Sequence, residues 1–473
     1  MATVVDQKQT VSVPLLAAEQ QPPPDKVLPW ILTLSVAFGA LLFGYHAGFS
    51  SPTDKAILAQ VFNGNRASLD FAWSILNIGA MIGALICGSA ASSLGRKPAI
   101  LLGCIPYVLG ALFMIFSSSL SSSLFTLGRF LAGAGVGYSS VIVPLYIAEI
   151  APPSLRGTLG CVNQLNISAG VLVVSVLGIA MVAHPWWWRP MLFTSLLFVI
   201  AQWVPIFFLA PESPAWLCAN GKIDQARASL VRLRGKNYQV DGELQSMALR
   251  NSQNASGSGA TGWIAIMMTP RLRRPVLVGI GLMILQQFSG INGVVFNMSS
   301  LFESSSNDDK ARYVAMFGTC FVNGFQVLST AVAVSMMEKF GRRQLLHTSC
   351  VGMALSCVLM SFASFFHLST FIKIFALCGY ICMFSIGVGP LAWLLCSEIF
   401  PGEIRSLAMA FATVLNWACA FAVTLTFEQT TVALGQHGLF LLYASFCVLG
   451  SLFVFIWVPE TRGLSLQEIE DMW

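Results

Sequence analysis

Residues 95–116 read GRKPAILLGCIPYVLGALFMIF, a basic motif followed by an apolar run, and residues 341–362 read GRRQLLHTSCVGMALSCVLMSF. An apolar run of about 20 residues is long enough to cross the hydrocarbon core of a bilayer as a helix. The same motif and run therefore occur twice in the chain. This repetition predicts membrane-spanning helices arranged in a duplicated unit.

Two further signatures repeat in the same order and at nearly the same spacing. Because three separate signatures share one offset, we interpret the second half of the chain as a copy of the first. Two repeated halves around a central site are typical of membrane transporters. The repeated residues are Glu149…Arg156 with Glu398…Arg405, and Pro211-Glu212-Ser213 with Pro459-Glu460-Thr461.

The composition is that of a protein whose solvent is largely lipid. Of the 473 residues, 56% are hydrophobic and only 10% are charged, and the mean hydropathy is +0.73. So few charges cannot cover a soluble surface. We therefore expect the lipid bilayer itself to be the partner that surrounds the protein. The net charge of +5 indicates no nucleic-acid partner, and the twelve cysteines stand singly without metal-ligand spacing, which predicts no metal and no cofactor.

Twelve apolar runs of spanning length predict an all-α membrane protein with six helices in each half. We expect a disordered cytosolic tail at 1–26, a first half at 27–210, a helical linker at 211–274, a second half at 275–458 and a cytosolic tail at 459–473. The runs begin near Val27, Phe71, Pro98, Leu124, Leu159, Pro190, Pro275, Arg312, Leu345, Phe371, Ser406 and Gly438.

The orientation follows from the positive charges, because Lys and Arg are retained on the cytoplasmic side of short loops. Most of the 26 Lys and Arg fall on the same side as the two termini and the linker. We therefore expect both termini and the linker in the cytosol. Within the linker, Ile223, Ala226, Leu230 and Leu233 have helical spacing and predict an amphipathic helix.

Charged residues at the linker-side ends of the spans predict a two-state latch. Basic motifs end the loops after spans two and eight, and glutamates end spans four and ten. Opposite charges that repeat in both halves can pair when this side closes and separate when it opens. The predicted latch residues are Arg96, Glu149, Arg156, Arg342, Glu398 and Arg405.

The run Gln286-Gln287-Phe288-Ser289-Gly290-Ile291-Asn292 places three amides inside a span. Buried amides are costly unless they are hydrogen-bonded, so they mark a cavity or a ligand. On an ideal helix Gln287 and Asn292 lie roughly 140° apart, and Gly290 and Gly293 permit a break that turns them toward one cavity. Neutral amides suit an uncharged ligand with many hydroxyl groups. Other amides within spans are Gln164, Asn323 and Asn416. Trp393 and Trp417 add an apolar face and an indole N–H that suit the same kind of ligand.

These motifs together resemble the sugar porter family of the major facilitator superfamily. The resemblance covers nearly the whole chain after the tail, and features such as Tyr45 and Gly160-Cys-Val-Asn-Gln-Leu165 are most similar to plant dehydration-responsive vacuolar monosaccharide transporters and animal endosomal facilitative glucose transporters. It implies alternating-access transport of a monosaccharide, glucose or a related hexose. It also implies a flexible point at Gly389-Pro390 and a hexose site formed by Gln164, Gln286, Gln287, Asn292, Asn323, Trp393 and Asn416.

The same resemblance raises the question of proton coupling. Proton-coupled members of the family carry an Asp in span one and a partner Arg in span four, whereas here the positions hold His46 and Arg129. Without the carboxylate, we expect facilitated diffusion. A free histidine titrates near neutrality, but burial beside an arginine would keep His46 neutral. Proton-coupled symport remains the alternative.

Other functions are compatible with parts of the pattern. A non-transporting sugar sensor would need a long signalling extension, and only sixteen residues follow Trp457. Paired carboxylates, a nucleophile with its base, or a metal cluster would indicate an enzyme, and none converges here, so we expect no enzyme. Transport of another polyol stays open, as do the exact sugar, the choice between plasma, vacuolar and endosomal membrane, and the oligomeric state, since the fold requires no oligomer.

Overall fold

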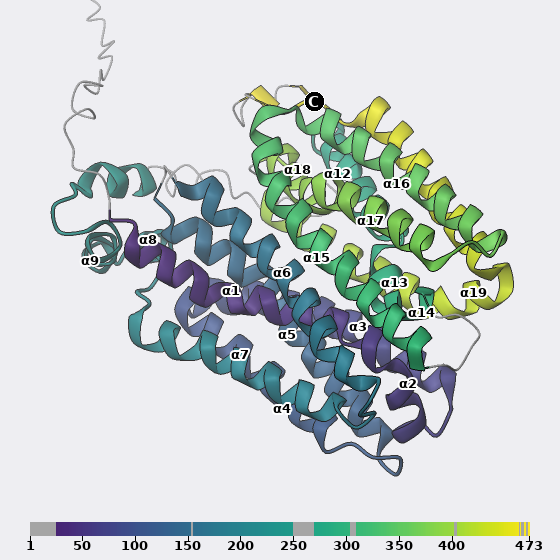
Figure 1. Cartoon of the computed structure of the whole chain (residues 1–473). Helices are drawn as coiled ribbons and strands as arrows, with labels where there is room; N and C mark the ends of the chain where they lie inside the picture. Colours follow the sequence, from purple (N-terminus) through teal and green to yellow (C-terminus); the bar gives the residue numbers. More distant parts are fainter. Residues whose placement is uncertain are drawn as a thin grey trace, which may run out of the picture.

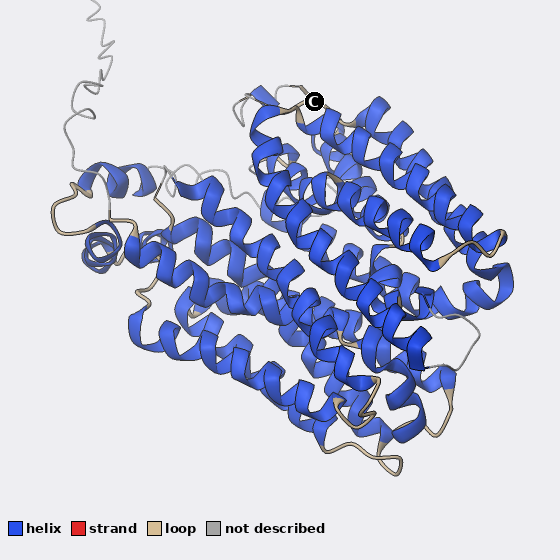
Figure 2. Cartoon of the chain, in the orientation of Figure 1, coloured by secondary structure: helices blue, strands red, loops and turns tan. Residues whose placement is uncertain are grey.

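The computed structural model describes residues 25–152, 155–248, 269–302, 309–401 and 404–462, together with 464, 468–469 and 472–473. Within these ranges every regular element is a helix (Figure 2). This confirms the predicted all-α class. The tail predicted at 1–26 lies almost wholly outside the described residues.

The first half contains seven α-helices, and one of them, α2, is a short helix at the end of the first span. Apart from α2, which carries Asp54 and Lys55, these helices are predominantly apolar, as expected for elements that face both lipid and neighbouring helices. The elements are α1 (Val27–Gly48), α2 (Ser50–Gln60), α3 (Arg66–Ser93), α4 (Arg96–Ile115), α5 (Ser122–Ile150), α6 (Arg156–Gly178), the 3-10 turn η3 (Ile179–Met181) and α7 (Trp188–Leu209).

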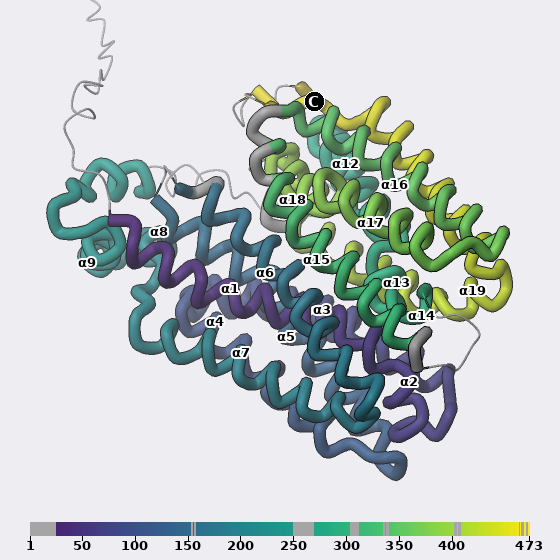
Figure 3. Tube along the Cα trace, in the orientation of Figure 1, coloured from purple at the N-terminus to yellow at the C-terminus, as the bar shows by residue number. Residues whose placement is uncertain are grey.

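The second half repeats this plan with more breaks. Two spans are interrupted, so that α12 is continued by α13 and α17 by α18. The elements are α12 (Pro270–Phe288), α13 (Ile291–Phe296), α14 (Met298–Phe302), α15 (Asp309–Lys339), α16 (Arg342–Phe365), α17 (Thr370–Ile386), α18 (Val388–Ile399) and α19 (Arg405–Trp457). Figure 3 shows the chain passing from the first half to the second without interleaving them.

Eleven helical stretches of the described residues are long and apolar enough to span a membrane, and the last of them contains two spans. α19 has 53 residues. At 1.5 Å per residue it would be about 80 Å long, more than twice the hydrocarbon thickness. Gly435 has a non-helical backbone (φ 70°, ψ 165°), and the helix turns back there (Figure 1). The structure therefore agrees with twelve crossings, six in each half.

The linker forms the helices α8 (Pro214–Ala219) and α9 (Ile223–Arg234). The spacing of apolar residues predicted α9, and Ala226, Leu230 and Leu233 are fully buried, whereas Ile223 is 41% exposed. We call the membrane face that carries α8 and α9 the linker side, and the opposite face, which carries α2 and α14, the distal side. The ribbons of the two halves meet near α2, α13 and α14 and separate toward the linker side (Figure 1).

Candidate functional site

Four of the predicted amides form one chain of hydrogen bonds in the middle of the second half. Asn292 donates from Nδ2 to Oε1 of Gln287 at 2.7 Å, and Gln287 donates from Nε2 to Oδ1 of Asn416 at 3.0 Å. Asn416 donates from Nδ2 to Oε1 of Gln286 at 2.8 Å. We call Gln286, Gln287, Asn292 and Asn416 the amide cluster. It joins α12, α13 and α19 and leaves spare donors and acceptors, since each amide offers two of each.

A single glycine makes this cluster possible. α12 ends at Phe288, and Gly290 adopts a left-handed conformation (φ 96°) before α13 begins. A Cβ atom at Gly290 would lie 2.5 Å from the ring of Tyr443, so a larger residue fits neither the backbone nor the space. The sequence predicted a break that turns Gln287 and Asn292 toward one cavity, and the break brings the two side chains into direct contact, although an ideal helix would separate them.

Gln286 also connects the amide cluster to the break between α17 and α18. Its Nε2 donates to the carbonyl oxygens of Gly389, at 2.8 Å, and Val388, at 3.2 Å. The helix is interrupted at Gly387, two residues before the Gly389-Pro390 pair for which flexibility was expected. The two N–H groups of this amide thus hold the start of α18 in place.

Polar groups along the contact between the halves have unused hydrogen-bonding capacity. Asn323 donates to Ser175 across the halves at 2.8 Å, and Asn77 donates to Thr424 at 2.9 Å. The remaining amide oxygens of Asn323 and Asn77 are buried without a partner, and so are Oε1 of Gln326 and Nε1 of Trp417. Buried polar atoms are normally paired, so these four carry hydrogen-bonding capacity that the described side chains leave unused.

The other predicted ligand residues occupy less decisive positions. Gln164 is half-buried on α6, one turn before Ser168, which contacts Thr330 of the other half at 3.2 Å. Trp393 is half-buried on α18 against the core of the second half. Trp417 packs against Phe43 of the first half, with ring centroids 5.6 Å apart. The structure therefore brings Asn323 and Trp417 to the boundary between the halves and leaves Trp393 inside one half.

His46 and Arg129 are in contact, as expected for the possible coupling pair. Nη1 of Arg129 donates to the backbone carbonyl of His46 at 3.0 Å, and the guanidinium lies over the ring of Trp73 at 4.9 Å. The imidazole stacks on Tyr107 with centroids 5.4 Å apart. Both side chains are fully buried. Arg129 thus contacts the backbone of His46 and not its ring.

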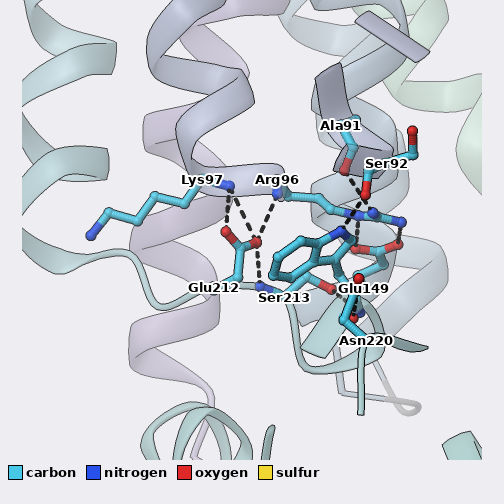
Figure 4. Close-up of polar contacts among 9 residues, drawn as sticks. Ala91, Ser92, Arg96, Lys97, Glu149, Glu212, Ser213 and Asn220 are labelled. Carbon is cyan, nitrogen blue, oxygen red and sulfur yellow. Dashed lines mark hydrogen bonds and ion pairs between the residues drawn. The ribbon is translucent and has the colours of Figure 1, made fainter. Parts of the chain in front are cut away.

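The latch residues of the first half form a bidentate ion pair. Arg96 donates from Nε and Nη2 to the two carboxylate oxygens of Glu149, at 2.8 and 2.7 Å (Figure 4). Its third donor, Nη1, bonds the carbonyl of Ala91 at 2.9 Å. Paired N–H···O bonds of this kind fix geometry as well as charge. The pair ties the start of α4 to the end of α5.

The second half repeats the pair in a looser form, and the pairing differs from the expected latch. Arg342 and Glu398 approach to 3.8 Å, and Glu398 also accepts a hydrogen bond from Thr461 at 2.6 Å. In both pairs the two partners belong to one half, because they come from neighbouring helices of the same bundle. Pairing between the halves is thus not what these four residues form in this conformation. The side chains of Arg156 and Arg405 lie outside the described residues.

Two glutamates of the repeated Pro-Glu signatures cap the basic motifs, a role that the sequence did not reveal. Glu212 accepts hydrogen bonds from the backbone N–H groups of Arg96, at 2.7 Å, and Lys97, at 3.2 Å (Figure 4). Glu460 does the same for Arg342 and Arg343, at 2.8 and 3.2 Å. A carboxylate at a helix N-terminus satisfies its free donors and complements its dipole. The repetition of both signatures was the available signal.

With this geometry, the chain can be compared with known proteins. The sequence model of the family described as "Sugar (and other) transporter" matches residues 32–473. The chain belongs to this sugar transporter family. A transporter of the same family, "Sugar transporter ERD6-like 6" of Arabidopsis thaliana, is 36% identical over 93% of this chain and 89% of its own length. It fits the plant subgroup expected from the sequence.

Two further similar proteins have names that mention other sugars. "Facilitated trehalose transporter Tret1" of Apis mellifera ligustica is 32% identical over 93% of this chain and 87% of its own length. The solved structure of the major facilitator proton:xylose symporter XylE bound to 6-bromo-6-deoxy-D-glucose has a TM-score of 0.80 at 25% identity, covering 94% of this chain and 99% of that one. The major facilitator fold is thereby confirmed, and the relatives are transporters, not enzymes.

The caps of this sugar transporter require glycine next to them. Gly95 has φ 101° and ψ 171°, a region that is essentially limited to glycine, and a Cβ atom there would lie 2.5 Å from Oε2 of Glu212. We expect Gly95→Ala to lower the midpoint of thermal unfolding in detergent by several degrees. Gly88→Ala on the neighbouring helix is the matched control, because a Cβ atom there meets nothing within 4 Å. Equal midpoints for the two variants would contradict the role of the cap.

On the distal side of the transporter, one arginine gathers three carboxylates. Arg66 lies 2.6 Å from Asp54, 2.8 Å from Asp70 and 3.8 Å from Glu428. Asp54 and Asp70 belong to the first half, whereas Glu428 lies on α19 in the second half. The backbone N–H of Ser299 donates to the hydroxyl of Ser51 at 3.0 Å, and this bond also joins the halves on this side. These contacts hold the distal side closed in this conformation.

Loss of the charge on Glu428 should favour the state that is open on the distal side. The pair is partly exposed, so it contributes about 0.2–1 kcal/mol. We therefore expect Glu428→Gln to improve the apparent affinity for sugar supplied on the distal face by up to about fivefold. Asp241→Asn is the control, since its exposed ion pair with Arg227 at 2.9 Å lies within the linker. An unchanged affinity in Glu428→Gln would contradict the gate.

Proposed function

We propose that this protein carries a neutral monosaccharide, glucose or a related hexose, across a membrane by alternating access and facilitated diffusion. The observation that carries the proposal is the uncharged character of the central groups. The amide cluster and the unpartnered polar atoms between the halves are amides and an indole. Such groups bond hydroxyls without requiring a charge on the ligand.

The distribution of carboxylates supports passive transport. Within the described spans, Asp70 and Glu428 lie near the distal ends and Glu149 and Glu398 near the linker-side ends. The described middle of the bundle therefore offers a proton no carboxylate. Proton-coupled symport is the second candidate, favoured by the likeness to a proton symporter and by the buried contact between His46 and Arg129.

Alternating access requires each half to move as a unit. The Arg96–Glu149 pair, the Arg342–Glu398 pair and the two glutamate caps stiffen the linker-side end of each half, while Gly387 and the adjacent Gly389-Pro390 pair supply a place to bend. We assign Arg156 and Arg405 to the closure of the linker side. The excess of Lys and Arg near the linker supports a cytosolic position for that side and for both termini, in a plasma, vacuolar or endosomal membrane.

A competition panel tests the choice of substrate. Purified protein is placed in liposomes and the uptake of labelled D-glucose is measured. Unlabelled hexoses, a pentose, trehalose and inositol are added in turn as competitors. We expect hexoses to inhibit most strongly and inositol least. Stronger inhibition by trehalose or inositol than by every hexose would replace the monosaccharide with another polyol.

A further inference from the structure

A cavity of about 190 Å³ lies on the distal side, away from the amide cluster. Its walls come from both halves. α2 and the segment around η3 contribute from the first half, and α14 and α15 from the second. By the same measure a cavity that holds one water needs about 10–15 Å³, so this one is large enough for a monosaccharide.

The lining combines hydrogen-bonding groups with an apolar wall. Asp54, Gln60, Ser300 and Arg312 supply the polar groups, and Met181 lies among the apolar side chains. Gln60 is held in place, since its Oε1 accepts from Trp188 at 3.0 Å and its Nε2 donates to Pro185 at 3.1 Å. Two of the roughly four acceptor sites of Asp54 bond Arg66 and Trp73, so others are left for hydroxyl groups.

We infer that this cavity is a second binding site, for a neutral polyhydroxyl compound such as a sugar. A sugar has polar edges that match the amide, hydroxyl and charged groups and C–H faces that match the apolar wall. The site is separate from the proposed transport site and does not depend on it.

Because the site lies between the two halves, a sugar bound there affects the rate of transport. Its two walls are joined where Ser51 contacts Ser299, so they are together only while the distal side is closed. A ligand shifts an equilibrium toward the state that it binds better. Sugar bound here therefore holds the distal side closed, and a high concentration on that side slows the transport cycle.

Saturation-transfer NMR on the full-length protein tests the site, with D-glucose as the probe. Ala59 lines the cavity and is exposed, so Ala59→Phe fills it without removing a polar group. The matched control is Ala219→Phe, at an exposed alanine of the linker. Both changes are made in a Gln286→Ala background, which removes binding at the proposed transport site.

We expect Gln286→Ala to keep about half of the wild-type signal, Gln286→Ala/Ala59→Phe to lose it, and Gln286→Ala/Ala219→Phe to retain it. Equal signals in the two double variants, or no signal in Gln286→Ala alone, would overturn the second site. A wild-type signal that persists in Gln286→Ala but disappears in Ala59→Phe alone would instead overturn the proposed transport site. The two claims thus fail in different ways.

Discussion

Gln286→Ala is expected to reduce sugar affinity at the amide cluster, and uptake, about 100-fold. The side chain accepts from Asn416 and donates to the carbonyls of Val388 and Gly389. Its removal takes away a hydrogen-bonding group for the sugar and releases Asn416 from its position, and each hydrogen bond that the bound sugar then lacks costs about 1–3 kcal/mol. A 100-fold loss of affinity corresponds to about 2.8 kcal/mol, which two such lost bonds supply. Initial uptake rates in liposomes measure the effect, and so does equilibrium binding in an Ala59→Phe background, in which the cavity of the distal side is filled.

A second buried amide provides the control for this prediction. Gln202 is 2% exposed on α7, and its described contact is a long one, 3.9 Å from the sulfur of Cys104. We expect Gln202→Ala to retain sugar affinity within about twofold, because the side chain is far from the amide cluster in the fold. If uptake by Gln286→Ala also stayed within twofold, the amide cluster would not be the sugar site.

Arg96→Glu is expected to lower the maximal uptake rate at least tenfold while sugar affinity changes much less. The substitution replaces a bidentate pair with two neighbouring carboxylates, and Glu149 is only 13% exposed. Breaking a partly buried pair and leaving one charge behind costs about 2 kcal/mol or more. We expect the effect on the rate because the pair lies at the linker-side end of α4 and α5, whereas the amide cluster lies on α12, α13 and α19.

Charge reversal distinguishes the pair from a general need for arginine. Arg96→Glu/Glu149→Arg should recover a substantial part of the rate, since the opposite charges face one another again. Arg342→Glu should have a smaller effect, because that pair is longer, at 3.8 Å, and Glu398 keeps its bond from Thr461. No recovery in the double variant would show that the interaction between the two side chains is not what the rate depends on.

The sequence predicted most of the fold because a bilayer constrains a chain strongly. Apolar length gives the spans, and the repeated signatures give the two halves. The amides of α12 and α13 were also predictable, because Gln287 and Asn292 stand in an apolar run with a glycine between them. The contact of Gln287 with Asn416 was not, since it joins residues that are 129 positions apart.

Most of the contacts that hold the halves together could not be predicted from the sequence. Arg66 and Glu428 carry no repeated motif, and their proximity depends on how the halves meet. The latch charges were identified by their repetition, but which helix each partner faces depends on packing inside each half. Glu212 and Glu460 were recognised as repeat markers, whereas their capping of the basic motifs needed backbone coordinates.

We expect the protein to move sugar passively through an uncharged site. The most direct measurement is uptake of the best substrate of the competition panel into liposomes with an imposed pH gradient, compared with the same liposomes after a protonophore. We predict that the internal concentration rises to the external one and stops there under both conditions. Accumulation above the external concentration that requires the pH gradient and disappears in His46→Ala would contradict the claim.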